Sequence, residues 1–349
     1  MKNKIRVFLG AYLNVSNAQN LNCKALAQHL DKGKFEVHAL SIYSRPEVKI
    51  PDVTIHKCFW PHRISSYLIY FKNIVFADVV YLPKGNKLGV LSFWCKLFNK
   101  KSISTIEGIF DEAARKNAIR ISGRNFIKYY QRFDKLYSIT SFMKDYNSEK
   151  HQLYTEDKIL YLGTDSDLFL NMDKKISALQ KVVMIGNDLV RKGIYDYLSL
   201  AKQFEDLEFH IVGSGNDKID VNEELKNRNL KNVIFHGLLS QDKIIELLDD
   251  IQLHILPSRS EGFPKVILET ASAAVPTIMY DDYGAGEWIE HQKNGFVVST
   301  IEQIADQIQE LLEDKSKLQR TSKNAVLLGK SFDWKNKIQH WEEVFLAEF

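Results

Sequence analysis

Two glutamates, Glu261 and Glu269, stand eight positions apart where an apolar segment gives way to a helical pattern. Residues 251–257 are apolar enough for a buried parallel strand, and residues 266–274 have helical spacing. One carboxylate is then expected in the strand-to-helix turn and the other about a turn and a half into the helix. Pro264 fits the first helical turn, where its missing N–H costs nothing.

Such a helix start suits an anion and a sugar together. The helix N-terminus presents free N–H donors and positive dipole character to a diphosphate. Carboxylates beside it accept hydrogen bonds from sugar hydroxyls. The pattern therefore predicts a sugar-nucleotide site. A simpler interpretation is an i,i+4 ion pair between Lys265 and Glu269 on a solvated helix face.

The same stretch, residues 258–276, resembles the Glu-x7-Glu signature of retaining glycosyltransferases of family four, the glycosyl transferases group 1. Residues 284–289 and 294–298 are similar to the family's two closing segments, and residues 162–169 to its inter-domain element. The resemblance covers the C-terminal half almost throughout and the N-terminal half only in layout. It implies a GT-B fold and a nucleotide-sugar donor.

The layout of the chain agrees with two similar halves. Strands expected at 5–9 and 181–185 each precede a loop and a helix, the helices at about 18–30 and 195–204. Short apolar strands that alternate with amphipathic helices predict parallel sheets covered on both faces. We therefore predict an α/β chain of two Rossmann-like, doubly wound domains that face each other across a cleft.

Three segments follow from this layout. A strand expected at 159–162 gives way to Gly163, which places a boundary there. Residues 1–165 are predicted to form an acceptor-binding domain and residues 166–330 a donor-binding domain, the two roles being those that the resemblance implies. Residues 331–349 have helical periodicity, and the resemblance implies a helix that packs back on the N-terminal domain.

A cationic loop, Gly186 to Gly193, follows the first strand of the second half. The family usually has an arginine and a lysine here, both in contact with the donor diphosphate. The resemblance makes Lys192 that lysine, a point charge suited to phosphate. Asn187 stands in place of the arginine, and Arg191 is a candidate substitute. Alternatively, Arg191 and Lys192 are solvated loop cations.

Further glycines follow two other expected strands of this half, at Gly213 and Gly237. Ligands of open α/β sheets bind at the carboxyl ends of strands, and glycine allows close backbone approach. Ordinary tight turns explain these glycines equally well. The donor-binding residues that the resemblance implies are Gly10, Gly186, Asn187, Arg191, Lys192, Gly213, His236, Gly237, Glu261, Gly262, Phe263, Pro264, Lys265, Val266 and Glu269.

In the first half, Gly10 is expected in the loop after the first strand, where the family's loop approaches the diphosphate. Glu107 stands where many family members have a histidine that points at the donor sugar. Its carboxylate suits a sugar hydroxyl or the acceptor, and an ordinary strand-end residue is the alternative. The catalytic set is then Glu261, Lys192 and Glu107.

The resemblance implies retention by front-face attack, with Glu261 positioning the donor sugar and Glu269 the ribose. No Asp-x-Asp pair stands beside the two glutamates to hold a divalent ion. We therefore expect no metal and no cofactor besides the nucleotide-diphosphate sugar. Lys192, loop N–H groups and the helix dipole would stabilise the leaving group.

Charge is divided unequally along the chain. Residues 1–165 hold 26 Lys and Arg against 14 Asp and Glu, and the remainder holds 21 against 30. A helix expected at 111–133 carries cations at every fourth position, and the set is Lys116, Arg120, Arg124, Lys128 and Arg132. This face suits anionic lipid headgroups or the acceptor. A solvated outer face is the alternative, and nucleic acid is disfavoured because no recognition motif accompanies the charge.

Composition narrows the class of protein. A length of 349 residues suffices for two cores, and the three cysteines, Cys23, Cys58 and Cys95, have no metal-ligand spacing. The start lacks a signal peptide, and no apolar run is long enough to span a membrane. We expect a cytoplasmic chain, with a peripheral position on the inner face of the plasma membrane as an extension.

The prediction is a metal-independent retaining glycosyltransferase that moves a hexose-type sugar from a nucleotide-diphosphate sugar to a glycan or lipid-linked acceptor. The expected setting is bacterial surface polysaccharide biosynthesis, such as lipopolysaccharide or capsule. Two alternatives stay open: a GT-B sugar-nucleotide epimerase, and a sugar-nucleotide-binding protein without catalysis.

Overall fold

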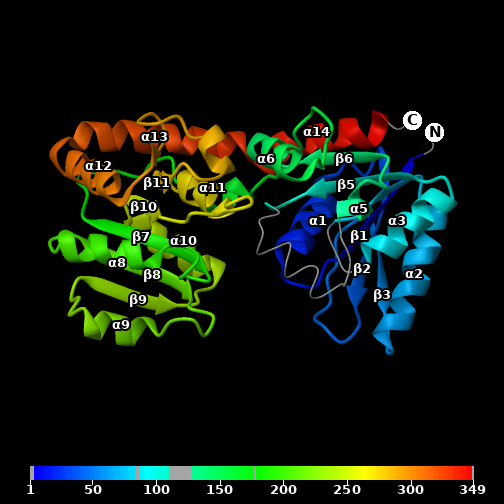
Figure 1. The fold of residues 1–349 in the computed structure, drawn as a ribbon, viewed down its shortest axis with the longest axis horizontal. Helices are drawn as coiled ribbons and strands as arrows, with labels where there is room; N and C mark the ends of the chain where they lie inside the picture. Colours follow the sequence, from blue (N-terminus) through cyan, green and yellow to red (C-terminus); the bar gives the residue numbers. More distant parts are fainter. Residues whose placement is uncertain (1–3, 84–86, 110–126, 177, 348–349) are drawn as a thin grey trace. The chain divides into compact units, whose positions relative to one another are not determined.

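The computed structural model describes residues 4–83, 87–109, 127–176 and 178–347. The chain divides into two compact units. Unit 1 consists of Met1–Leu162 together with Trp334–Phe349, and unit 2 of Gly163–Asp333. The backbone therefore leaves unit 1 after Leu162 and returns to it at Trp334. Each unit is an α/β structure built on its own sheet (Figure 1).

Unit 1 contains a six-stranded parallel sheet in the order β3-β2-β1-β4-β5-β6. The strands are β1 (Ile5–Tyr12), β2 (Phe35–Ile42), β3 (Val53–Cys58), β4 (Val79–Tyr81), β5 (Lys101–Ile106) and β6 (Lys135–Ser138). The helices are α1 (Ala18–His29), α2 (His62–Phe76), α3 (Leu88–Leu97), α5 (Ile127–Tyr130), α6 (Ser141–His151) and α14 (Trp334–Ala347). The strand order reverses direction between β1 and β4, as in a Rossmann sheet.

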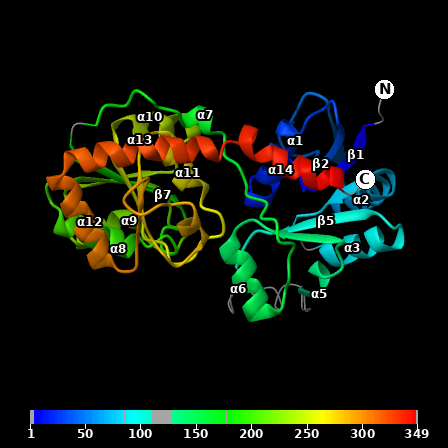
Figure 2. The same ribbon diagram turned by 90° about the horizontal axis from the view of Figure 1, so that it is seen from above.

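Neighbouring residues of β4 show how this sheet separates two apolar layers. Val80 belongs to the core beneath α2 and α3, with Leu91 among its members. Tyr81, the next residue, contacts Trp341 of α14 edge-to-face, with 5.5 Å between ring centroids. Because successive strand residues point to opposite faces, α2 and α3 cover one face and α14 the other. Figure 2 shows α14 beside α1.

The C-terminal helix α14 is bound to unit 1 by polar contacts as well. The Trp341 indole N–H donates to the carbonyl of Tyr161 at 3.0 Å. Glu342 accepts from the backbone N–H of Asp31 and pairs with Lys34, both at 2.8 Å. These contacts join the last helix to the connection after α1, more than 300 positions earlier in the chain.

Unit 2 repeats the arrangement with the strand order β12-β11-β10-β7-β8-β9. The strands are β7 (Lys181–Asn187), β8 (Glu208–Ser214), β9 (Val233–Gly237), β10 (Leu253–Leu256), β11 (Thr277–Tyr280) and β12 (Phe296–Val298). The helices are α7 (Ser166–Phe169), α8 (Ile194–Gln203), α9 (Val221–Asn227), α10 (Gln241–Asp250), α11 (Lys265–Ser272), the 3-10 helix η1 (Gly284–Glu287), α12 (Ile301–Glu313) and α13 (Lys315–Ser331).

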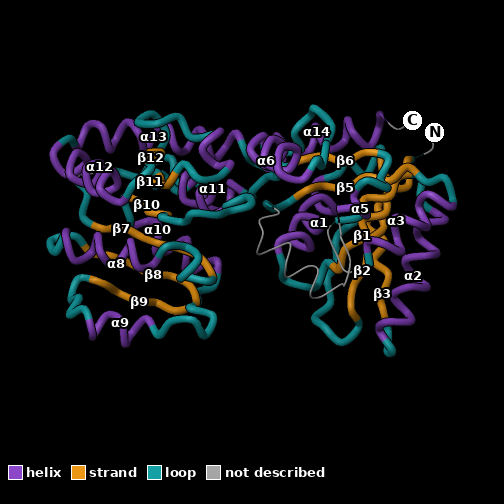
Figure 3. The backbone as a smooth tube through the Cα atoms, in the orientation of Figure 1, coloured by secondary structure: helices purple, strands orange, loops and turns teal. Residues whose placement is uncertain are grey.

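Two cores fill unit 2, one on each face of its sheet. Met184 of β7 packs in the core that includes Tyr197 of α8 and Ile308 of α12. Val183, its neighbour in the strand, packs with Leu248 of α10 on the other face. Figure 3 shows the strands of each unit among covering helices. The prediction of two doubly wound parallel sheets is confirmed.

Some strand predictions were wrong in detail. Gly10 was expected in a loop but lies inside β1, which continues to Tyr12 with an irregular register. Residues 159–162 were expected to form a strand but have no regular structure. Leu160 donates one backbone hydrogen bond to Ser138 of β6, and the carbonyl of Tyr161 is used by Trp341 instead of a neighbouring strand.

The helix expected at 111–133 falls largely outside the described residues, and so do Lys116, Arg120 and Arg124. In the described part, α5 ends at Tyr130, three residues before the expected end. The N–H groups of Arg132 and Phe133 donate three positions back, to Tyr129 and Tyr130, at 3.3 and 3.2 Å. Such bonds close a tight turn rather than continue an α-helix.

A fully buried histidine should make unit 2 sensitive to acid. Burial lowers the pKa of His254 on β10 from 6.5 to about 3, with a smaller contribution from Lys192. Because the unfolded chain takes up this proton and the folded chain does not, stability is present above pH 6.5 and is lost as the pH falls. We expect this group to cost up to about 1.4 kcal/mol of unfolding free energy per pH unit in that window.

Urea unfolding between pH 7 and pH 4 tests this. His254→Asn should show a shallower fall in stability with acidification than the wild type. His340→Gln is the control, because His340 is about half exposed. Equal slopes in wild type and His254→Asn would contradict the prediction.

Candidate functional site

Most of the predicted donor residues lie at the carboxyl ends of β7 and β10, which are adjacent in the sheet of unit 2. Gly186 and Asn187 form the end of β7, and Lys192 lies in the loop that follows. Glu261 lies in the turn after β10. The strand order reverses between β7 and β10, and open α/β sheets bind ligands at this switch point.

Lys192 and Glu261 meet at this point as an ion pair. The Lys192 Nζ atom lies 2.8 Å from Glu261 Oε1, and their side chains are only 9% and 7% exposed. Arg191 Nη1 approaches the same oxygen at 3.2 Å from a more exposed position. Lys192 is thus a buried charge that faces the signature carboxylate, which excludes its interpretation as a solvated loop cation.

Two glycines make room for this loop. Gly186 has φ +155°, and a Cβ there would lie 2.7 Å from Cε of Lys192. Gly213, its partner on β8, has φ +141°, and a Cβ there would lie 1.8 Å from the carbonyl oxygen of Gly186. Side chains at either position would displace the lysine or the strand end. Close backbone approach, rather than an ordinary turn, explains both residues.

Glu269 lies on the second turn of α11 and is half-buried. Burial raises the pKa of its carboxyl, while the positive charge of Lys265 lowers it by less. A solvated i,i+4 pair would not show this order of effects. The position is that of a carboxyl partly withdrawn from water, one helix turn from the loop that holds Glu261.

The N-terminal end of α11 is held by aromatic packing. Pro264 is the N-cap residue, one position before the first helical turn in which it was expected. Phe263 packs on Trp288 with 4.7 Å between ring centroids, and Trp288 packs on Phe332 at 4.9 Å. Sequence reasoning assigned no role to Trp288 or Phe332, because their contact with the signature loop joins distant segments.

A cavity of about 680 Å³ opens at the ends of β8 and β9, next to the loop of Lys192. Gly213 and Gly237 line it, as does Lys218, which pairs with Asp188 at 2.7 Å. The pair connects the loop after β7 to the loop after β8. Sequence reasoning missed Lys218 and Asp188, although both follow strand ends where ligands are expected.

His236 is directed toward His210 of the neighbouring strand β8. Its Nε2 atom lies 2.9 Å from Nδ1 of His210, the two rings are stacked, and His210 pairs with Glu208 at 2.6 Å. Burial, followed by the neighbouring His210, lowers the pKa of His236. Its Nε2 atom is therefore engaged by a protein partner, and the residue is absent from the lining of the cavity.

In unit 1, Glu107 follows β5 and accepts hydrogen bonds from three neighbouring elements. Asn22 of α1 donates at 2.9 Å, Thr105 at 3.1 Å and Tyr81 of β4 at 3.3 Å. The carboxylate is therefore held in one orientation at the carboxyl end of the sheet. It is a positioned group rather than a loosely placed strand-end residue.

Gly10 borders a second site in unit 1, a cavity of about 340 Å³. A Cβ at Gly10 would lie 2.4 Å from Cδ2 of Leu82, so a side chain there would displace Leu82. Lys87 lines the same cavity and lies over the rings of Tyr67 and Tyr70, at 4.7 and 5.3 Å from their centroids. Burial lowers the pKa of Lys87.

The two described members of the basic stripe, Lys128 and Arg132, are exposed. The Arg132 guanidinium donates to the carbonyl of Gly89 at 3.0 Å and lies over the ring of Tyr129. Arg132 therefore fastens the turn after α5 to α3. Within the described part of the chain, no group of three or more His, Cys, Asp or Glu is arranged to hold a metal ion.

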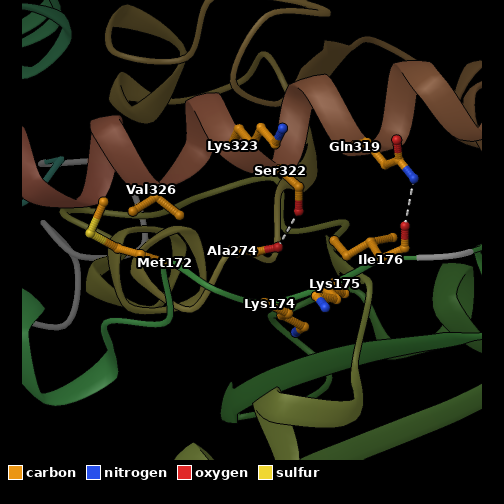
Figure 4. A pocket seen from close by; sticks show the side chains of 9 residues that line it. All are labelled: Met172, Lys174, Lys175, Ile176, Ala274, Gln319, Ser322, Lys323 and Val326. Carbon is orange, nitrogen blue, oxygen red and sulfur yellow. Dashed lines mark hydrogen bonds between the residues drawn. The ribbon is translucent and has the colours of Figure 1, made fainter.

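Another cavity of unit 2, of about 450 Å³, lies beside α13 and contains none of the predicted site residues (Figure 4). Its lining includes Ile176, which precedes β7, and Ala274, which precedes β11, so it is at the opposite ends of the strands. Lys174 donates to the carbonyls of Leu248 and Ile251 at the end of α10. Burial lowers the pKa of Lys174 to about 8.

The buried pair Lys192–Glu261 should be costly to break from one side. Glu261→Ala leaves the ammonium of Lys192 buried without its carboxylate, and we expect a loss of about 3–5 kcal/mol of unfolding free energy. Lys192→Met combined with Glu261→Met removes both charges and should recover most of that loss. Urea unfolding at neutral pH measures each value.

Arg191→Ala is the matched control, because it removes the exposed partner of the same carboxylate. Its cost should stay within about 1 kcal/mol. If Glu261→Ala were no more destabilising than Arg191→Ala, the carboxylate would not be paired in a buried position.

Known proteins resemble this chain in sequence and in structure. The family model of glycosyl transferases group 1 matches residues 172–327. An uncharacterized glycosyltransferase of Methanocaldococcus jannaschii is 26% identical over 331 residues, which are 89% of each chain. The N,N'-diacetylbacillosaminyl-diphospho-undecaprenol alpha-1,3-N-acetylgalactosaminyltransferase of Campylobacter jejuni is 24% identical, over 72% of this chain and 71% of that protein.

Among solved structures, Anabaena Alr3699/HepE in complex with UDP-glucose has a similar fold, with a TM-score of 0.78 and 16% identity. The similarity covers 98% of this chain and 100% of that one. Three observations agree with this fold. The chain has two parallel six-stranded sheets, Glu261 lies at the switch point of the second sheet, and the family model matches the same unit. Residues 172–327, most of unit 2, therefore match the glycosyl transferases group 1, and the chain has the GT-B fold.

Proposed function

We propose that this chain is a retaining transferase of family four that moves a hexose-type sugar from a nucleoside-diphosphate sugar to a glycan or lipid-linked acceptor. The observation that carries the proposal is the buried contact between Lys192 and Glu261 at the switch point of unit 2. It sets a cation for phosphate and a carboxylate for sugar hydroxyls side by side at the start of α11.

Each group has a part in the reaction. The anomeric carbon loses its bond to the donor phosphate and gains a bond to the acceptor oxygen on the same face. The departing diphosphate takes the acceptor proton, and Lys192 and the N–H groups at the start of α11 stabilise its charge. Lys192 must then turn from Glu261 toward the phosphate when the donor binds, which frees Glu261 for the sugar hydroxyls.

The nucleoside is assigned to unit 2. The cavity at the ends of β8 and β9 has room for a base and ribose beside the glycines at Gly213 and Gly237. Glu269, half-buried on α11, is the proposed ligand of the ribose hydroxyls. The similar Anabaena protein was solved with UDP-glucose, which supports a uridine nucleotide as the donor.

The acceptor is assigned to unit 1, where Glu107 is held by three hydrogen bonds. The name of the Campylobacter relative specifies a diphospho-undecaprenol acceptor, which supports a lipid-linked acceptor here and a part in surface polysaccharide synthesis, as for lipopolysaccharide or capsule. A peripheral position on the inner face of the plasma membrane would bring the enzyme to such a substrate.

Asn187 favours two alternative functions, because the family usually has a diphosphate-binding arginine at this position. It is exposed at the end of β7 where the resemblance calls for an arginine. A sugar-nucleotide epimerase would convert the donor without an acceptor, and a binding protein would hold it unchanged. Product analysis of UDP-glucose incubated with and without a lipid-linked glycan separates these two from a transferase.

Glu269→Ala should weaken UDP binding about 10- to 100-fold, because a hydrogen bond to a charged group contributes about 1.5–3 kcal/mol. Calorimetric titration with UDP measures the affinity. Glu313→Ala, an exposed glutamate on α12, is the control and should bind UDP as the wild type does. Unchanged affinity in Glu269→Ala would remove this residue from the site.

Turnover should survive EDTA. The charge of the leaving diphosphate is assigned to Lys192 and backbone N–H groups, so chelation of divalent ions should leave the initial rate within about twofold, less than 0.5 kcal/mol of barrier. A rate lost in EDTA and restored by magnesium or manganese would show that the diphosphate is held by a metal instead.

A further inference from the structure

Helix α2 of unit 1 exposes a stripe of large apolar side chains. The stripe consists of Ile64, Leu68, Phe71 and Val75, and Leu68 is 65% exposed. Spacings of four, three and four residues keep these side chains on one side of a helix. An adjoining side of α2 is buried in the core through Tyr70 and Ile74. The helix is therefore anchored in the core and still leaves an apolar stripe exposed.

Helix α3 continues this apolar surface. Its exposed residues Val90, Phe93 and Leu97 have spacings of three and four, and Leu97 is 61% exposed. Trp94 of α3 contacts Tyr67 and Phe71 of α2 edge-to-face, with ring centroids 6.0 and 5.4 Å apart. The two stripes thus lie side by side, as Figures 1 and 2 show for their helices.

An exposed tryptophan stands at the start of α2. Trp60 is 84% exposed, and Phe59 beside it is about half exposed. We call the surface formed by these two residues and the two stripes the α2–α3 face. Monomeric proteins rarely leave a contiguous apolar patch of this kind in water, so such a face marks an interaction surface.

The exposed charged side chains that α2 and α3 themselves carry have one sign. Residues 53–77 and 79–106 contain no aspartate or glutamate. Asp78, between these ranges, is held by the guanidinium of Arg6. Arg63, Lys72 and Lys96 are exposed on the two helices, and none of them pairs with a carboxylate of the described residues. Within the described residues, the exposed charged side chains of α2 and α3 are therefore all cationic.

This combination fits one occupant. Aromatic and aliphatic side chains enter the acyl boundary of a bilayer, while lysine and arginine beside them attract anionic headgroups. Lysine is depleted at protein–protein interfaces, yet two of the three exposed cations here are lysines. Among the described residues, no helix is long and apolar enough to cross a membrane.

We propose that the α2–α3 face is the surface by which this enzyme docks on an anionic lipid bilayer, with Trp60 inserted at the interface. The contact is independent of the donor site, which lies in unit 2. Vesicle binding needs no sugar nucleotide, so a failure of this proposal and a failure of the transferase proposal are distinguishable.

The test is cosedimentation of the full chain with vesicles of phosphatidylglycerol and phosphatidylcholine, compared with phosphatidylcholine alone. The wild type should bind the anionic vesicles at low salt and partition at least about tenfold less in 0.5 M NaCl, where the Debye length is only a few ångströms. Leu68→Ser with Phe93→Ser should abolish binding, and Lys72→Gln with Lys96→Gln should weaken it about tenfold.

Matched substitutions on the surface of unit 2 control for general effects of losing an exposed leucine or two exposed lysines. Leu327→Ser alters an equally exposed leucine on α13 of unit 2, and Lys202→Gln with Lys231→Gln alters exposed lysines there. All of these should bind vesicles as the wild type does. Brominated lipid should quench tryptophan fluorescence in the wild type, and Trp60→Phe should bind but lose most of this quenching, because the other tryptophans are partly or fully buried.

Three results would overturn the proposal. One is the absence of wild-type binding to anionic vesicles at low salt. Another is equal loss of binding in the unit 2 controls. The third is a dimer, seen by sedimentation without lipid, that dissociates in the Leu68→Ser, Phe93→Ser variant, because the face would then be covered by a second copy of the chain.

Discussion

The buried contact between Lys192 and Glu261 is the interaction on which the proposed donor site depends. Two opposite charges are held out of water at the point where the strand order reverses, and neither can be removed alone without a large cost. The surrounding structure follows from that requirement. Gly186 and Gly213 leave space for the lysine, and the packing of Phe263 on Trp288 holds the turn that carries the glutamate. In the absence of donor, the pair neutralises the two charges that we propose bind the diphosphate and the sugar hydroxyls.

Both units have the same strand order, and each contains a hydrogen-bonded group of two histidines and a glutamate. In unit 1, His38 lies 3.0 Å from His56 and 2.9 Å from Glu36. In unit 2, His210 stands in the same relation to His236 and Glu208. Each group joins the second and third strands of its Rossmann order, near the edge of the sheet. The repetition identifies these histidines as part of the sheet, and it explains why His236 is absent from the lining of the cavity at the ends of β8 and β9.

The two faces of the sheet in unit 1 differ in what covers them. Helix α14 returns from unit 2 and buries Tyr81 and Phe35 beneath its aromatic residues. Helices α2 and α3 bury only their inner sides and leave an apolar, cationic surface outside. A transferase with a lipid-linked acceptor would gain from such a surface, because docking confines the enzyme to the plane in which its substrate moves. Unit 2 carries the acidic excess of the chain, so its net charge does not favour contact with anionic lipid.

The amino-acid sequence alone determined the α/β class, the two parallel sheets and the strand-to-helix turn of Glu261, because alternation of short apolar strands and helices is a local property. It also located Lys192 and the strand-end glycines. Only the tertiary structure decided that Lys192 meets Glu261 across 69 positions and that Gly10 lies inside a strand. It also decided that some apolar residues of α2 lie in the core while others are exposed on its outer side. Periodicity identifies which residues share a face, but whether that face is covered depends on segments that arrive from elsewhere in the chain.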